Sequence, residues 1–221
     1  MKLALRALTK YLIGLLLVGA LLFLPAWSLS YPNAWLFLGA LFLPMLVLGV
    51  VMLFKSPALL EKRLNAKETE RTQRGVVALS ALMFIVGFVI AGLDFRFGWS
   101  YVPVWAVIVA LVVLLVAYAL YAEVMRENAY LSRTIEVREG QRVVDTGLYG
   151  IVRHPMYAVT LWLFLAIPIV LGSWWAFLCF LPYIPVIAVR IVNEERVLLA
   201  GLEGYADYQK RVKYRLIPFV W

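Results

Sequence analysis

Apolar residues dominate this chain in long uninterrupted runs, and the charged residues fall between the runs. Four stretches contain no Asp, Glu, Lys or Arg, and they cover residues 11–54, 75–93, 97–122 and 154–189. A helix that crosses the hydrocarbon core of a membrane needs about 20 mainly apolar residues. The runs 75–93 and 97–122 therefore predict one membrane-spanning helix each.

The first and last runs are long enough for two helices each, and both contain a break. Residues 28–33, Ser-Leu-Ser-Tyr-Pro-Asn, divide the first run, and Gly172-Ser173 divides the last. Such turn-forming residues predict a loop between two helices. The pattern thus predicts an all-α, polytopic membrane bundle of six segments, the last two forming a helical hairpin. The segments are expected at 11–27, 33–54, 75–93, 101–122, 156–171 and 173–192.

The distribution of Lys and Arg predicts the orientation of these segments. Six crossings bring 20 of the 21 Lys and Arg residues to one side, together with both ends of the sequence, and leave only Arg96 on the other. Positively charged residues mark cytoplasmic loops. We therefore expect an integral cell-membrane protein whose termini and functional site face the cytoplasm.

Composition supports the membrane interpretation and excludes several other classes. Hydrophobic residues make up 64% of the chain, against about 45–50% in soluble domains. The net charge of +8 comes from loops and lines no single groove, so nucleic-acid binding is not expected. Cys179 is the only cysteine and the chain has one histidine, which excludes an intrachain disulfide and an ordinary zinc site.

The segments outside the main runs give further expectations. The basic residues before the first run also occur in signal peptides, but no clear small-residue cleavage site follows them. Residues 55–74 predict a short amphipathic helix at the headgroup level, and 134–145 predict two short extended pieces around a glycine turn. The outer turns predict an interfacial aromatic belt. Its members are Trp27, Tyr31, Trp35, Trp99, Tyr101, Trp105, Trp174 and Trp175.

The candidate chemistry lies at the inner end of the last hairpin. The only histidine is in the sequence Arg-His-Pro-Met-Tyr at residues 153–157. A hairpin that folds about residues 172–173 brings this motif opposite residues 190–195. Arg190 and Glu194 are spaced i, i+4 and share one helix face. Ionisable residues in a membrane protein are functional candidates, so we expect a site here.

Three segments of the chain resemble the isoprenylcysteine carboxyl methyltransferase family. They are TGLYGIVRHPMY at 146–157, RIVNEE at 190–195 and GYADYQKRVKYRLIP at 204–218. The resemblance covers roughly residues 120–221, and the related membrane phospholipid methyltransferases share the pattern. One departure is Ala158-Val159 after Tyr157, where many relatives carry a small glycine.

This resemblance implies an S-adenosyl-L-methionine-dependent methyltransferase without a Rossmann domain, acting on a hydrophobic small-molecule or lipid acceptor. It implies one membrane domain over 1–221, with a four-helix scaffold at 1–122 and a cofactor-binding and catalytic half at 123–221. Arg190 and Glu194 would flank the acceptor, whose carboxylate is the favoured methylation target. The implied cofactor-binding residues are Leu148, Tyr149, Arg153, His154, Pro155, Tyr157, Glu195, Tyr205, Tyr208 and Arg215.

The residue types suit such a donor, but two other functions stay open. Arg153, His154 and helix N–H groups suit a carboxylate, and tyrosine rings suit a sulfonium cation. A membrane sterol-reductase-like enzyme shares the C-terminal pattern, and the basic residues at 211–215 offer a site for the 2′-phosphate of NADPH. A non-enzymatic transporter or assembly protein is the other alternative, although repeats and midplane charges typical of transporters are missing from the sequence.

Overall fold

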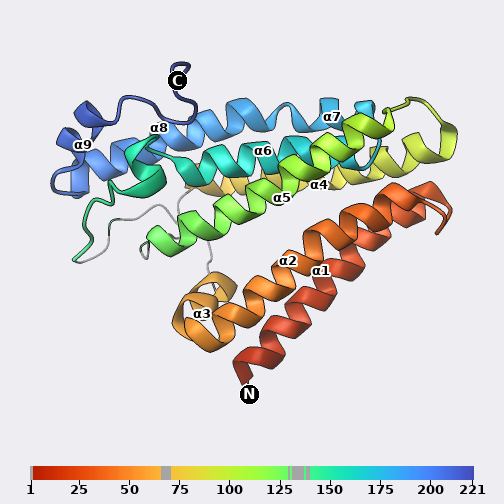
Figure 1. Ribbon diagram of the computed structural model, residues 1–221, viewed down its shortest axis with the longest axis horizontal. Coiled ribbons are helices and arrows are strands. Elements are labelled where there is room, and N and C mark those ends of the chain that lie inside the picture. The colour runs from red at the N-terminus through yellow and green to blue at the C-terminus, as the bar shows by residue number, and fades with distance from the viewer. Residues whose placement is uncertain (1, 66–70, 129, 131–136, 138–139) are drawn as a thin grey trace.

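The computed structural model describes residues 2–65, 71–128, 130, 137 and 140–221. Every regular element within these ranges is a helix, which confirms the all-α prediction (Figure 1). The elements are α1 (Lys2–Ala26), α2 (Pro32–Lys55), α3 (Pro57–Asn65), α4 (Arg71–Phe97), α5 (Val104–Glu127), the 3₁₀ turn η1 (Gly147–Gly150), α6 (Pro155–Val170), α7 (Trp174–Phe180), α8 (Tyr183–Gly201) and α9 (Tyr205–Arg211).

Five helical stretches of the described chain are long and apolar enough to cross a membrane. They are α1, α2, residues 77–97 of α4, α5, and the α7–α8 stretch 174–201. Helix α6 is apolar but has only 16 residues, about 24 Å at 1.5 Å per residue, against about 30 Å for a hydrocarbon core. All six predicted segments are therefore helical, but the number of six crossings is not confirmed.

Helix boundaries differ from those predicted from charge alone, and the largest differences are in α1 and α8. Helix α1 begins at Lys2, well before the predicted start at residue 11, and α8 continues to Gly201, past the predicted end at residue 192. Lys, Arg and Glu are good helix formers, and long basic side chains can reach the membrane surface from within a helix. A charged residue therefore limits the membrane-embedded part of a helix without ending the helix.

The predicted hairpin turn is confirmed at residues 171–173. Gly172 takes a positive φ of 79°, a conformation that glycine adopts without the steric cost of a Cβ. Ser173 then caps α7, because its Oγ accepts a hydrogen bond of 3.0 Å from the backbone N–H of Ala176. Pro182 stands at the break between α7 and α8, where its missing N–H interrupts the helical ladder.

The aromatic residues of the outer turns are exposed, with one exception. Trp27 is 78% exposed and Tyr101 77%, as expected of side chains that lie at a membrane interface. Tyr31 differs from the prediction because it is only 2% exposed and donates a hydrogen bond of 2.6 Å to the backbone oxygen of Leu171. Tyr31 therefore fixes the hairpin turn against α2 rather than facing lipid.

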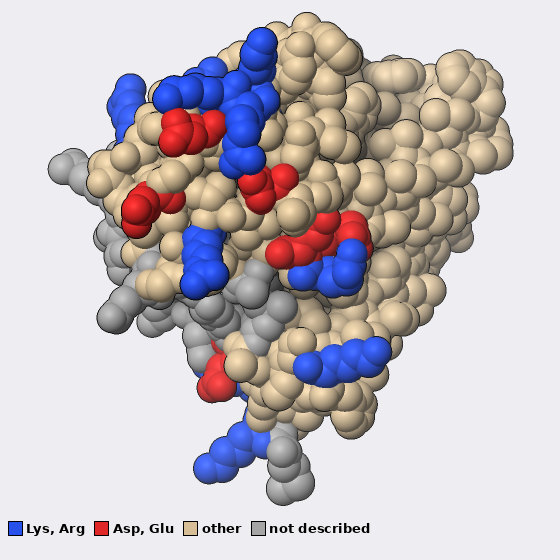
Figure 2. All heavy atoms as spheres, turned by 60° about the vertical axis from the view of Figure 1, so that its left-hand side comes forward, with Lys and Arg blue, Asp and Glu red and all other residues tan. Residues whose placement is uncertain are grey.

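The charged side chains gather at the other end of the helices. Figure 2 shows Lys, Arg, Asp and Glu together on one face, beside a flank without charges. Helix α3 occupies part of the predicted amphipathic segment 55–74, of which residues 66–70 lie outside the described chain. Of the two predicted extended pieces, the first lies mostly outside the described residues, and residues 141–145 form no strand.

Candidate active site

A tight turn after α5 begins the site. Gly147 has a φ of 52°, which favours glycine, and a Cβ at this position would displace the Glu127 carboxylate, whose Oε1 lies 1.4 Å from it. The Glu127 carboxylate accepts a hydrogen bond of 3.1 Å from the backbone N–H of Leu148. Asn128 donates to the Tyr149 hydroxyl at 3.0 Å. The end of α5 therefore holds η1 in place and orients Tyr149.

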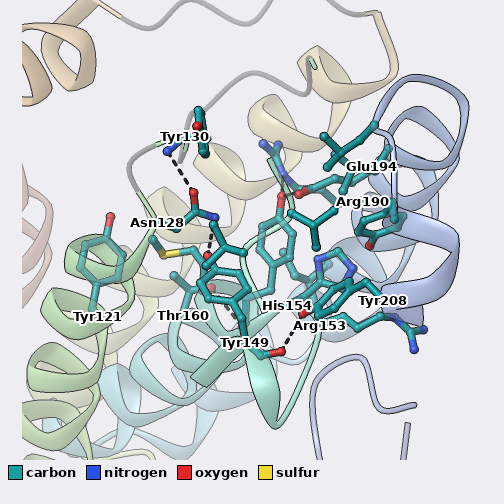
Figure 3. Close-up of a pocket in the computed structure, with 18 of the residues that line it drawn as sticks. Tyr121, Asn128, Tyr130, Tyr149, Arg153, His154, Thr160, Arg190, Glu194 and Tyr208 are labelled. Atoms are coloured by element: carbon teal, nitrogen blue, oxygen red, sulfur yellow. Dashed lines mark hydrogen bonds between the residues drawn. The ribbon is translucent and has the colours of Figure 1, made fainter. Parts of the chain in front are cut away.

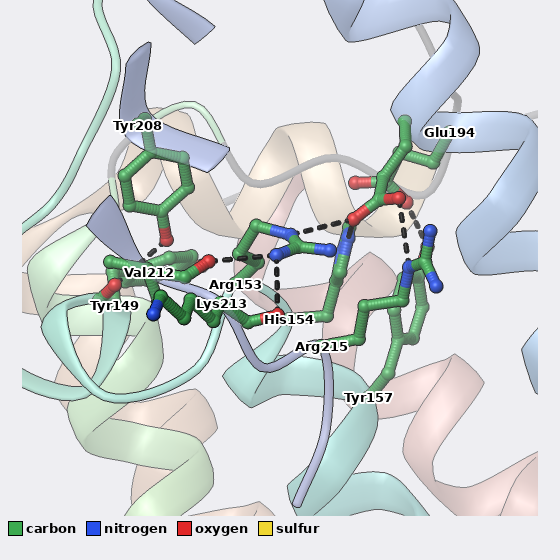
Figure 4. A network of polar contacts seen from close by, with 10 residues as sticks. Tyr149, Arg153, His154, Tyr157, Glu194, Tyr208, Val212, Lys213 and Arg215 are labelled. Carbon is green, nitrogen blue, oxygen red and sulfur yellow. Dashed lines mark hydrogen bonds and ion pairs between the residues drawn. The ribbon is translucent and has the colours of Figure 1, made fainter. Parts of the chain in front are cut away.

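The buried carboxylate of Glu195 gathers three basic side chains (Figure 4). Arg153 donates through Nε to Oε1 at 2.8 Å, and Arg215 donates through Nε to Oε2 at 2.9 Å. His154 Nε2 lies 3.2 Å from Oε1. Buried charges require such pairing, and the two guanidinium groups together exceed the single charge of Glu195. The cluster is therefore cationic and suited to an anion.

The segment after α9 completes this cluster by pairing with the start of α6. The backbone N–H groups of Arg153 and His154 donate to the carbonyl oxygens of Tyr214 and Arg215, both at 2.9 Å. Arg153 Nη1 also donates to the carbonyl oxygen of Val212 at 2.7 Å and to that of Lys213 at 2.8 Å. Main-chain and side-chain bonds thus fix one guanidinium between two distant parts of the sequence.

A second polar group joins α6 to α8. Tyr157 donates a short hydrogen bond to the Glu194 carboxylate, and Arg190 donates through Nε to the Tyr157 hydroxyl at 2.9 Å. The Arg190 guanidinium also lies 5.7 Å from the centroid of the Tyr157 ring. The predicted facing of residues 153–157 and residues 190–195 is thereby confirmed, although the individual pairs lie a few residues further along α8 than a hairpin about residues 172–173 predicts.

Both polar groups border one cavity of about 550 Å³, a volume typical of small-molecule sites. In Figure 3, Tyr121 and Asn128 lie on the opposite side of the view from Arg190 and Glu194. The polar end of the wall includes Arg153 and His154, while the part between α4, α6 and α8 is mainly apolar. That apolar wall includes Val77, Phe84, Met156, Phe164, Ile187 and Leu198.

Tyrosine side chains close the polar end of the cavity. Tyr149, Tyr205 and Tyr208 all contribute to the wall and are buried. Tyr208 donates to the backbone oxygen of Tyr149 at 2.7 Å. Burial raises the pKa of all three phenols above the ordinary value, because an ionised phenol loses its hydration there. These hydroxyl groups therefore stay protonated at physiological pH.

Eight of the twelve residues expected from sequence border the cavity. They are Tyr149, Arg153, His154, Tyr157, Arg190, Glu194, Tyr205 and Tyr208. The other four do not border it. The backbone N–H of Leu148 is bonded to Glu127, and Pro155 is the first residue of α6. Glu195 holds the basic cluster together, and Arg215 is one of its three basic members. Their roles stay predictions.

Sequence reasoning missed several polar residues of the site, and four of them illustrate why. Glu127 and Asn128 support η1, and Thr160 and Tyr183 line the cavity. Glu127 and Asn128 carry a signal, because they are polar residues a few positions after the long apolar run 97–122. Thr160 and Tyr183 carry none, since isolated hydroxyl groups in apolar helices are common. Helix α4, which belongs to the predicted scaffold 1–122, also contributes to the cavity wall. The division of the chain into a scaffold and a catalytic half stays a prediction.

The geometry agrees with one known protein family. Residues 103–202, from the start of α5 to just past α8, match the family model for phospholipid methyltransferase. No curated protein matches the chain. The matched segment contains Arg153, His154, Arg190, Glu194 and Glu195. Together with the five long apolar helices, the match indicates a multi-pass membrane protein whose residues 103–202 are similar to the phospholipid methyltransferase family.

Proposed function

We propose that the chain transfers a methyl group from S-adenosyl-L-methionine to a lipid-like acceptor at the cytoplasmic membrane face, with carboxylate O-methylation as the favoured reaction. The observation that carries this proposal is the two-part cavity. Its polar end holds a cationic cluster and tyrosines, and its other end runs between apolar helices. A water-soluble charged donor and a hydrophobic acceptor would meet where the two parts join.

The polar end has the chemistry that the donor requires. The donor carries a carboxylate, an ammonium, a ribose diol and a sulfonium. Arg153 and His154, backed by Glu195, suit the carboxylate. Tyr149 and Tyr157 present rings that favour a sulfonium. These residues fit the donor, and Tyr208 and Arg215 would hold the cover of the site in place.

The reaction is a direct displacement at the methyl carbon. An acceptor oxygen forms a bond to that carbon, and the carbon–sulfur bond breaks with its electron pair going to sulfur. A carboxylate acceptor has no proton to lose, so the protein mainly has to align the reactants. Arg190 would hold the acceptor carboxylate, and the bond between Tyr157 and Arg190 would keep its guanidinium in place.

The acceptor would enter from the bilayer between α4 and the α7–α8 stretch. A second hollow of about 200 Å³ opens there, next to the break at Pro182. It shares Ser80 and Tyr183 with the main cavity. Its remaining wall is apolar, with Leu79, Leu82, Met83, Val86, Cys179 and Val186. An acyl or prenyl chain could therefore remain in an apolar environment while its reactive group reaches Arg190.

An amine headgroup is the second candidate acceptor. The matched family is described as phospholipid methyltransferase, and the Glu194 carboxylate borders the cavity. An amine must lose a proton during methylation, and Glu194 would accept it. The two acceptors would therefore use different members of the Arg190–Glu194 pair: a carboxylate would depend on Arg190, and an amine would depend on Glu194.

The proposal is tested by calorimetric binding of S-adenosylhomocysteine to the detergent-purified protein. Wild type should bind it, and His154→Ala and Glu195→Ala should abolish the binding while the protein stays folded. The exposed Glu203→Gln variant is the matched control and should bind like wild type. Failure of folded wild type to bind, with binding of NADPH in its place, would support a reductase and contradict the proposal.

Methyl transfer from labelled donor then distinguishes the acceptors. A prenylcysteine with a free carboxylate and a phosphatidylethanolamine micelle should be compared in wild type, Arg190→Gln and Glu194→Gln. For a carboxylate acceptor we expect Arg190→Gln to lose the most activity, by roughly a hundredfold or more. A larger loss in Glu194→Gln, with phosphatidylethanolamine as the methylated lipid, would favour the amine.

A further inference from the structure

Residues 215–221 form a closed turn that satisfies most of its own main chain. Five of its backbone N–H groups are bonded within the turn, at 2.8–3.3 Å. Those of residues 215–217 donate to the carbonyl oxygen of Trp221, and those of residues 220–221 donate to the carbonyl oxygen of Ile217. Irregular backbone can lie at membrane depth only where its polar groups are satisfied by the protein, and this turn largely meets that condition.

The tip of the turn carries two apolar side chains that contact little of the protein. Phe219 is 87% exposed and Val220 is 75% exposed. Phe219 also has a φ of 67°, which is sterically unfavourable for a bulky residue but which glycine adopts freely. A strained backbone that keeps an apolar ring exposed indicates that the ring has a contact outside the chain.

The turn lies beside the start of α6, at the charged end of the helices. The backbone N–H groups of Arg153 and His154 donate to the carbonyl oxygens of Tyr214 and Arg215, both at 2.9 Å. In Figure 1 the chain accordingly runs back from α9 toward α6 instead of extending away from the helices. Residues 215–221 are therefore at the level of the first turn of α6.

The length of α6 places this level at the membrane boundary. Helix α6 has 16 residues, which span about 24 Å, and it runs from this level to the hairpin turn at residues 171–173. The exposed Trp174 and Trp175 beside that turn mark the opposite membrane surface. A hydrocarbon core is about 30 Å thick, so the start of α6 lies no higher than the edge of the core. Side chains exposed at that level face lipid rather than water.

The neighbours of the tip are those of an interfacial segment. The rings of Phe219 and Tyr214 have centroids 5.2 Å apart, and the Arg215 guanidinium lies 5.1 Å from the centroid of the Trp221 ring. Lys213, directly before this group, is exposed. Tyrosine and tryptophan are enriched at membrane interfaces, and exposed basic side chains bind anionic headgroups there. The partner that fits this surface is therefore the lipid itself.

We propose that residues 217–221 are a membrane anchor, in which Phe219 and Val220 insert among the lipids at the charged end of the helices. The same turn begins with Arg215, which donates to the Glu195 carboxylate at 2.9 Å. Insertion of the tip therefore holds Arg215 on the basic cluster of the site. This second part rests on the proposed function, whereas the insertion itself does not.

Spin labels on single cysteines test the insertion in full-length protein, in nanodiscs of phosphatidylcholine and phosphatidylglycerol. The background variant is Cys179→Ala, because Cys179 is the only native cysteine. A label at Phe219→Cys should collide with oxygen more than with a water-soluble nickel chelate. It should resemble a label at Leu16→Cys, which replaces a side chain 72% exposed on the apolar helix α1. Glu203→Cys, exposed between α8 and α9, is the water-facing control.

Two results of this measurement would overturn the anchor. One is a label at Phe219→Cys that is as open to the nickel chelate as the label at Glu203→Cys, since the tip would then lie in water. The other is a label shielded from both oxygen and the nickel chelate, since the tip would then be covered by protein instead of lipid.

Binding of S-adenosylhomocysteine in the same nanodiscs tests the link to the site. Joint Phe219→Ser and Val220→Ser substitution should raise its Kd about fivefold or more, the usual size of coupling between linked sites. Leu29→Ser is the matched control, because it removes a side chain 70% exposed at the opposite membrane surface and should leave the Kd unchanged. An unchanged Kd in the joint variant, or an equal rise in the control, would overturn the link. If wild type bound no S-adenosylhomocysteine, the proposed function would be wrong, and the label positions would still support or overturn the anchor.

Discussion

Two buried carboxylates stand at opposite ends of the helices, and they have different kinds of partners. Asp94, at the end of α4, is 2% exposed and accepts hydrogen bonds from the backbone and hydroxyl of Ser100 and from the hydroxyl of Ser173. Glu195, near the end of α8, is 4% exposed and is paired with Arg153, His154 and Arg215. Among the described residues, Asp94 accepts hydrogen bonds from neutral groups only, whereas Glu195 pairs with basic side chains.

The difference shows that burial of a charge does not by itself indicate a functional site. Asp94 ties together the end of α4, the following turn and the hairpin turn, and it does not border the cavity. Glu195 fixes two residues that do border it, Arg153 and His154. A buried carboxylate is therefore a candidate functional residue when its partners also line a cavity that can bind a ligand.

Among the substitutions that test this comparison, Glu195→Gln is expected to have the largest effect on stability and on ligand binding. The change leaves the buried Arg153 and the partly exposed Arg215 without their counter-charge, which should lower the free energy of unfolding by about 3–5 kcal/mol. Binding of S-adenosylhomocysteine should be lost, because Arg153 and His154 lose their common anchor. Chemical unfolding and calorimetry measure the two effects. Near-wild-type binding in this variant would show that the cluster is only structural.

A smaller effect is expected for Tyr157→Phe, which keeps the ring and removes the hydroxyl between Arg190 and Glu194. The loss of a hydrogen bond to a charged group should lower kcat/KM for the acceptor by about 10- to 100-fold. The Kd of S-adenosylhomocysteine should change much less. Tyr118→Phe is the control, because that hydroxyl bonds the backbone of Leu41 and Tyr118 does not line the cavity. Equal losses in the two variants would contradict a positioning role for Tyr157.

Sequence alone predicted the helices and half of the polar side chains that line the cavity, and the reasons are physical. A run of apolar residues fixes a spanning helix, and a hairpin about residues 172–173 fixes which residues face each other. That hairpin predicts that residues 153–157 face the stretch 190–195, but it places Tyr157 opposite residue 188, whereas the structure pairs Tyr157 with Glu194. Helix ends were less predictable, since α1 and α8 continue through charged residues.

The tertiary partners within the cluster were not predictable from spacing. Arg215 reaches Glu195 only because residues 214–215 pair with the backbone of residues 153–154. No periodic pattern marks such pairing between two irregular segments. The burial of Tyr31 was missed for a similar reason, because its partner, the backbone of Leu171, is 140 residues away.

The smallest effect on the site is expected for Asp94→Asn. The amide cannot accept all the hydrogen bonds that the carboxylate accepts from Ser100 and Ser173, so the free energy of unfolding should fall by about 1–3 kcal/mol. Ser173 and Glu195 lie at opposite ends of the α7–α8 stretch, roughly 30 Å apart at 1.5 Å per residue. Distant sites act independently as a rule, so the Kd of S-adenosylhomocysteine should stay within about twofold of wild type.

Matched unfolding and binding curves for Asp94→Asn and Glu195→Gln therefore distinguish a carboxylate that stabilises the fold from one that supports a binding site. Loss of binding in Asp94→Asn at full occupancy of the folded state would mean that the outer turn and the site are coupled through α8, and the distinction between the two ends would fail.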